Sequence, residues 1–107
     1  MTIKADQLEE YESRRFEPNQ SVAPLEEIKE AIAAEATTMR VPLAFKYDYV
    51  QSGGLLNKVK DEALIVLHGE HPKDYYKYIL YYSHTKYGTV LKIGISGTSK
   101  HRGKLAV

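Results

Sequence analysis

The sequence predicts an α+β fold: two N-terminal helices packed on an antiparallel meander sheet of four to five strands. Residues 24–40 repeat apolar side chains at spacings of three and four, as a helix with one buried face requires. From residue 43 the apolar period changes to two, which is typical of strands. Helices followed by strands indicate the α+β class. The 107 residues suit a single domain, with a helical half at 2–40 and a sheet half at 43–104.

Two helices are expected before residue 41. Residues 2–16 are rich in helix-forming side chains but carry a thin apolar stripe, so this helix is expected to lie on the surface. Pro18 ends it. The second helix opens at Pro24 and carries glutamates in its early turns, where the helix dipole favours anions. It is expected to pack on the sheet that contains Ile65 and Leu67, through the stripe Leu25, Ile28, Ile32, Ala36 and Met39.

The strands are expected in the second half of the chain. Residues 43–50 alternate apolar and polar side chains, and glycines at 53 and 54 form a turn. Residues 55–60 are consistent with a short strand or with an irregular return. Residues 63–67 are continuously apolar, as in a central strand covered on both faces. The runs 75–82 and 89–96 are expected to form a hairpin whose turn closes at Gly88.

The composition excludes several classes of protein. The chain is 43% hydrophobic and 27% charged and contains no cysteine, so neither disulfides nor thiolate metal sites can stabilise it. No apolar stretch approaches the ~20 residues that span a bilayer. The N-terminus lacks the apolar core of a signal peptide, and a cytoplasmic location without membrane association is therefore expected.

Charge is distributed unevenly along the chain. Residues 1–40 carry five Lys/Arg against nine Asp/Glu, and residues 41–107 carry ten against five. The hairpin is followed by a glycine-punctuated segment, 97–104, that contains Lys100, Arg102 and Lys104. Such a segment can present positive charge to phosphate, and an uneven charge distribution steers anionic partners. The alternative explanation is that helices favour glutamate and strand edges favour lysine.

Six of the nine tyrosines lie between residues 75 and 87. On a strand, Tyr76, Tyr78 and Tyr82 would share one face with Leu80, and Tyr75 and Tyr81 the other. Aromatic rings interleaved with lysine can stack nucleic-acid bases. They can equally form a protein interface, since tyrosine is enriched at binding hot spots. A third explanation needs no ligand, because tyrosine suits half-exposed strand positions.

Metal and cofactor sites are not predicted. His68, Glu70 and His71 place three metal-binding side chains within four residues, but a zinc site also needs ligands from elsewhere and a fixed outer shell. No Walker loop and no Gly-x-Ser-x-Gly turn occurs in the sequence. We therefore expect no bound metal at these histidines and no organic cofactor.

The predicted hairpin carries the tripeptides Ile-Leu-Tyr at 79–81 and Lys-Ile-Gly at 92–94, followed by Arg102. In this pattern, residues 75–104 resemble the first half of a GIY-YIG nuclease domain of the phage type, whose second motif commonly begins with lysine. The resemblance implies that the motifs lie on neighbouring antiparallel strands. It also implies a divalent metal, held in the family by a glutamate on a later helix. The sequence departs from the family at Ile79, where the first glycine is expected.

The same resemblance implies roles for individual residues. Tyr81 would help to activate the attacking water, and Arg102 would hold the scissile phosphate. Lys92 would occupy the aromatic position of the second motif, and Gly94 would permit close approach of the backbone. The family's metal-binding glutamate and the helices that carry it have no counterpart in the few residues after Lys104.

Two function classes are consistent with the sequence. The first is a small nucleic-acid-associated protein that binds through Lys92, Gly94, Lys100, Arg102 and Lys104. In one version of this hypothesis the chain is a shortened GIY-YIG-like nuclease domain, which would act as a phosphodiesterase. The second is a non-enzymatic protein-interaction module, such as a small inhibitor or adaptor. It would use the tyrosine face or the acidic helices to bind a protein partner or a further copy of itself. Phosphate contacts would give the first class a steep salt dependence of binding that a tyrosine-centred interface lacks.

Overall fold

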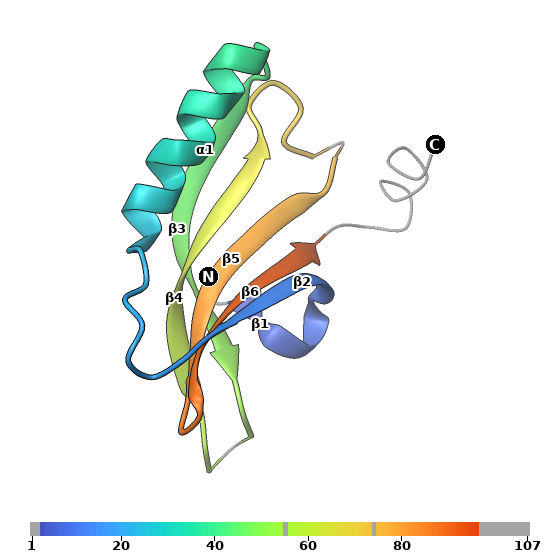
Figure 1. Ribbon diagram of the computed structural model, residues 1–107. Coiled ribbons are helices and arrows are strands. Elements are labelled where there is room, and N and C mark those ends of the chain that lie inside the picture. The colour runs from blue at the N-terminus through green and yellow to red at the C-terminus, as the bar shows by residue number, and fades with distance from the viewer. Residues whose placement is uncertain (1–2, 55, 74, 97–107) are drawn as a thin grey trace.

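A computed structural model describes residues 3–54, 56–73 and 75–96 and shows one helix on a six-stranded mixed sheet (Figure 1). The predicted α+β class is therefore confirmed. The sheet order is β1-β3-β4-β5-β6-β2. The elements are β1 Ile3–Lys4, the 3-10 turn η1 Ala5–Gln7, β2 Glu9–Phe16, α1 Leu25–Met39, β3 Leu43–Ser52, β4 Val59–His68, β5 Lys77–Thr85 and β6 Gly88–Ser96.

The strands β3 to β6 form the antiparallel meander that the sequence predicts. Two further strands enlarge it. β2 pairs antiparallel with β6, and the short β1 pairs parallel with β3 at the opposite edge. The prediction of a purely antiparallel sheet of four to five strands is therefore too simple. No separate strand forms among the described residues of 55–60, where β4 begins at Val59.

The predicted helix at 2–16 is wrong. Most of that segment is β2, which is exposed along almost its whole length. Its sequence contains good helix formers and no apolar alternation, so local preference favours a helix. Pairing with β6 supplies the missing backbone hydrogen bonds, and this long-range contact overrides the local preference. The segment Glu9–Phe16 is consequently part of the sheet.

The predicted second helix is confirmed as α1, with a correction to its packing. Leu25 is buried, and the stripe lies against Leu64, Val66 and Leu80 on one face of the sheet. The predicted partners Ile65 and Leu67 belong to the cluster on the opposite face. Met39, expected in the stripe, is 64% exposed because the helix ends immediately after it.

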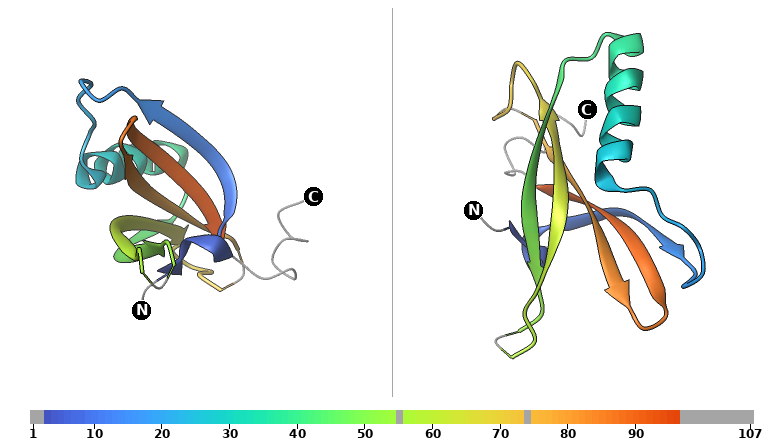
Figure 2. Two further views of the ribbon diagram at one scale, coloured as in Figure 1. Left: turned by 90° about the horizontal axis from the view of Figure 1, so that it is seen from below. Right: turned by 90° about the vertical axis from the view of Figure 1, so that its left-hand side faces the viewer.

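The sheet has two differently covered faces, seen edge-on in Figure 2 (right). α1 covers one face, where the hydroxyl of Tyr82 donates a hydrogen bond to the carbonyl of Ala23 just before the helix. The segment β1–η1 crosses the other face, where Ile3, Ala5 and Leu8 pack on the cluster that includes Ile79 and Tyr81. Strands covered on both faces explain the continuous apolar run in β4.

Among the described residues no helix has the length and apolar character that a membrane span requires. The turn between β5 and β6 closes at Gly88, as predicted, with a φ of 131° that disfavours any side chain. A Cβ there would also lie 2.2 Å from the carbonyl oxygen of Phe16. Gly88 therefore fixes the hairpin and lets β2 approach β6 closely.

Candidate functional site

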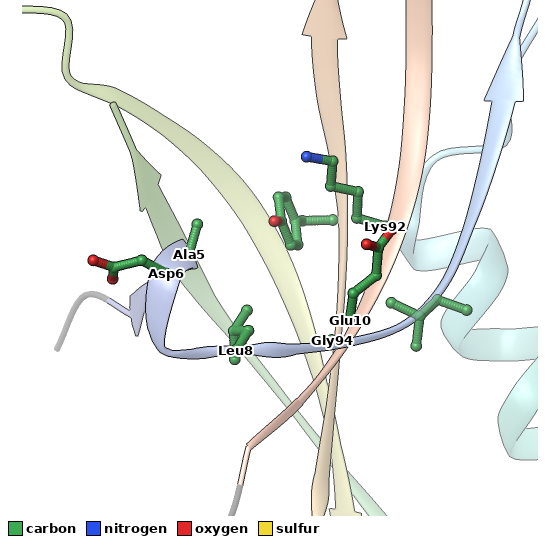
Figure 3. A pocket seen from close by; sticks show the side chains of 8 residues that line it. Ala5, Asp6, Leu8, Glu10, Lys92 and Gly94 are labelled. Atoms are coloured by element: carbon green, nitrogen blue, oxygen red, sulfur yellow. The ribbon is translucent and has the colours of Figure 1, made fainter. Parts of the chain in front are cut away.

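Three of the residues singled out in the sequence line one hollow beneath the N-terminal segment (Figure 3). Tyr81 on β5 lies directly opposite Lys92 on β6, and Gly94 follows on the same face. The hollow encloses ≈ 310 Å³. Its lining consists of Ala5, Asp6, Leu8, Glu10, Tyr81, Lys92, Ile93 and Gly94. The remaining predicted site residues, Lys100, Arg102 and Lys104, lie outside the described residues.

The charges around this hollow are mixed in sign. Glu10 and Asp6 line it together with Lys92, although the carboxylate of Asp6 points away from Lys92 in Figure 3. Asp61 on β4 lies on the same face. Burial raises the pKa of the Asp61 carboxyl above its ordinary value of 3.8, and the charges of His84 and Lys92 oppose that rise. An anion approaching Lys92 therefore meets neighbouring carboxylates, so the described part of the predicted basic patch is not a strongly positive surface.

The phenol of Tyr81 is suited to hydrogen bonding. Its side chain is 6% exposed. Burial raises the pKa of Tyr81 above its ordinary value of 10.0, and the carboxylates of Asp61 and Glu10 raise it further. The phenol consequently stays protonated at neutral pH and is able to donate a hydrogen bond. The lowered pKa that helps a tyrosine to activate water is not produced by this environment.

Gly94 accommodates the side chain of Leu8. A Cβ at residue 94 would lie 3.0 Å from the Cβ of Leu8 and 3.1 Å from its Cδ1. The missing side chain thus lets the N-terminal segment rest on β6. The resemblance to the nuclease family gave this glycine a different task, the approach of backbone to phosphate, whereas the space above it is filled by Leu8.

The loop after β4 is held by hydrogen bonds between its backbone and the side chain of His68. The Nδ1 atom of His68 accepts hydrogen bonds from the backbone N–H groups of Glu70 (3.2 Å) and His71 (3.0 Å). Across residues 3–54, 56–73 and 75–96 no three acidic or histidine side chains gather in a metal-binding arrangement. The expected lack of a tight zinc site at these residues stays a prediction.

A second candidate site is a group of aromatic rings at the end of the sheet where β5 begins. Tyr11 and Tyr78 meet edge to face, with ring centroids 5.6 Å apart. His68 stacks on Tyr75 at 5.1 Å, and His71 lies 5.1 Å from His68. We call these five residues the aromatic patch. Tyr11 is 60% exposed, and Tyr75 and Tyr78 are each 36% exposed, so their rings can contact a partner.

A small apolar hollow connects the two halves of the aromatic patch. It encloses ≈ 180 Å³ and is lined by Leu43, Val66, Leu67, His68, Tyr75, Tyr76 and Tyr78. Rings that are partly exposed beside an apolar hollow can bury an inserted side chain while their polar atoms bond to its backbone. This arrangement suits the binding of a protein or peptide.

Two features of these sites escaped prediction from the sequence. Glu10 and Tyr11 were placed on a helix, which hid their proximity to β5 and β6. Asp61 lay outside the strand predicted at 63–67, although it alternates with Ala63 and Ile65 and so shares their face. The face assignments of Leu80, Tyr81 and Tyr82 are confirmed, because Tyr81 and its two neighbours belong to opposite clusters.

Comparison of the chain with protein-family models, with curated proteins and with solved structures found no match.

Proposed function

We propose that this protein is a non-enzymatic protein-interaction module that binds a protein partner through the aromatic patch. The observation that carries the proposal is the edge-to-face pair of Tyr11 and Tyr78, exposed beside an apolar hollow. Tyrosine and other aromatic residues dominate binding hot spots, which sit in well-packed pockets that exclude water. An apolar side chain of the partner would enter the hollow between Tyr75 and Tyr78.

Several contacts support a preformed surface. Tyr75 is held against His68 by stacking, and His68 is fixed in turn by its two backbone hydrogen bonds. Tyr78 lies on β5 within the meander, where its backbone is paired on both sides. Rings that are already ordered lose little conformational entropy on binding, which raises affinity.

The nucleic-acid alternative rests on Lys100, Arg102 and Lys104, which lie outside the described residues. Its described cation, Lys92, is close enough to Asp61 to oppose the rise of that carboxyl's pKa, and it shares its hollow with Glu10. These carboxylates weaken the attraction of Lys92 for phosphate. We therefore favour the protein partner and treat nucleic-acid binding as an outcome of the test.

The test is affinity purification from lysate, with and without nuclease treatment, using three forms of the protein. They are the wild type, the double variant Tyr11→Ala/Tyr78→Ala, and the control Tyr87→Ala, whose ring is 62% exposed at the β5–β6 turn. A partner that co-purifies with wild type and control should be lost with the double variant. Its Kd should rise about 30-fold or more, as for hot-spot residues. Recovery that the double variant leaves intact, or that nuclease treatment abolishes, would contradict the proposal.

A further inference from the structure

The hollow beneath the N-terminal segment contains a tyrosine hydroxyl without a partner. Tyr81 is 6% exposed, and it lines this hollow of ≈ 310 Å³. Among the described residues its hydroxyl forms no hydrogen bond, whereas the hydroxyl of Tyr82, on the other face of the sheet, donates to Ala23. No buried side-chain nitrogen or oxygen of the described residues lacks a partner, so the Tyr81 oxygen opens into the hollow. Because polar groups in largely buried side chains are normally hydrogen-bonded, this hydroxyl is available to a ligand.

The same hollow holds charges of both signs. The register of the sheet places Lys92 directly opposite Tyr81, and Glu10 opposite Gly94 on the same face. The side chains of Glu10 and Lys92 both line the hollow (Figure 3). Within the described part of the chain no ion pair joins Lys92 to Glu10 or to Asp61. Each charge is therefore able to contact an oppositely charged group of a ligand.

A ligand with a single charge fits this hollow poorly. An anion that contacts Lys92 is repelled by Glu10, and a cation that contacts Glu10 is repelled by Lys92. A ligand that carries both charges satisfies both residues, since its carboxylate can contact Lys92 while its ammonium contacts Glu10. The Tyr81 hydroxyl can donate to the same carboxylate, and a hydrogen bond to a charged group is stronger than one between neutral groups.

The apolar part of the lining indicates the rest of the ligand. Ala5 and Leu8 line the hollow from the N-terminal segment, and Ile93 lines it from β6. Small-molecule sites combine such apolar walls with a few polar groups that fix the ligand's orientation. The volume of this hollow lies at the lower end of the usual range of about 300–1,000 Å³. Its size and lining suit a molecule of amino-acid size with an apolar side chain.

We infer that this hollow binds a free α-amino acid with an apolar side chain. The carboxylate of the ligand lies between Lys92 and the Tyr81 hydroxyl, its ammonium contacts Glu10, and its side chain packs on Leu8. Tyr78 and Tyr81 are three positions apart on β5 and lie on opposite faces of the sheet, so this site is separate from the aromatic patch. Amino-acid binding and partner binding are therefore independent properties.

The probe is L-leucine, titrated into isotope-labelled protein and followed by the NMR shifts of the backbone amides. The amides of Tyr81, Lys92 and Gly94 should shift, with a Kd of about 1 mM or below. Two analogues test the pairing of charges, because isoamylamine lacks the carboxylate of leucine and isocaproate lacks its ammonium. Each analogue should bind at least about tenfold more weakly than L-leucine. Lys92→Met, Glu10→Gln and Tyr81→Phe should each raise the Kd for L-leucine by about tenfold.

The controls separate the hollow from net charge, from folding and from the aromatic patch. Lys86→Met and Glu12→Gln remove the same charges at exposed residues that do not line the hollow, and both variants should bind L-leucine as wild type does. Tyr78→Ala should also leave this Kd unchanged. Tyr81→Phe removes a hydroxyl that has no partner among the described residues, so it should melt with wild type. A wild type that does not respond to L-leucine at its solubility limit, analogues that bind as tightly as L-leucine, or an unchanged Kd in Lys92→Met would overturn the inference.

Discussion

The close contact between residue 94 and Leu8 predicts how Gly94→Ala changes the stability of the protein. The substitution should destabilise the protein when residue 8 is leucine, but not when the side chain of residue 8 has been removed. In wild type, Gly94→Ala would place the new Cβ 3.0 Å from the Cβ of Leu8, so the N-terminal segment must shift. Such overpacking costs about 1–3 kcal/mol, and replacing a glycine within a strand recovers about 0.5–1 kcal/mol. The variant should therefore be less stable than wild type by about 1 kcal/mol. In a Leu8→Gly background the contacts with both Cβ and Cδ1 of residue 8 are removed, and the same substitution should be neutral or stabilising.

The assay is urea unfolding of the four proteins in this double-mutant cycle, since a domain of this size is expected to unfold in one transition. The coupling energy between residues 8 and 94 should be about 1 kcal/mol or more. Gly54→Ala is the matched control, because no atom lies within 4 Å of the Cβ position at residue 54. If Gly94→Ala had the same effect in both backgrounds, the N-terminal segment would not rest on β6 as described.

Two other variants test the core and the charged hollow. Leu64→Ala removes a side chain that is 0% exposed between α1 and the sheet and should cost about 3–5 kcal/mol in urea unfolding, whereas Leu56→Ala, at a 96% exposed position, should cost less than about 0.5 kcal/mol. Because the folded-state pKa of Asp61 is raised, the folded protein binds this proton more tightly than the unfolded chain, and stability falls as pH rises from 3.8 through the raised value. Asp61→Asn should therefore melt above wild type at neutral pH, and equal melting temperatures there would show that burial does not disfavour the Asp61 charge.

The elements that were predicted correctly are those whose burial leaves a periodic pattern. The stripe from Leu25 to Ala36 repeats at helical spacing because one side of α1 faces the sheet. In β3 to β6, apolar and polar side chains alternate as strands require. The turn at Gly88 then indicates that β5 and β6 form a hairpin, so Tyr81 and Lys92 could be expected to lie side by side. Both signals are local, which is why a single sequence was sufficient.

The elements that were missed depend on contacts between distant parts of the chain. β2 has exposed residues almost throughout, and only its pairing with β6 makes it a strand. Without β2 in the sheet, the contact between Tyr11 and Tyr78 could not be anticipated, nor could the position of Glu10 near Tyr81. The tyrosines between residues 75 and 87 were recognised from composition, but Tyr11, the most exposed tyrosine of the aromatic patch, came from the segment predicted as a helix.

The central claim is that the aromatic patch binds a protein partner. Its most direct test is titration calorimetry of the purified partner with wild type and with Tyr11→Ala/Tyr78→Ala, each at low and high salt. The proposal predicts a wild-type Kd that changes little with salt, and a loss of about 30-fold or more in the double variant. A Kd that rises steeply with salt and is the same for wild type and the double variant would contradict the claim. Such a result would place the binding energy in charge contacts away from the aromatic patch.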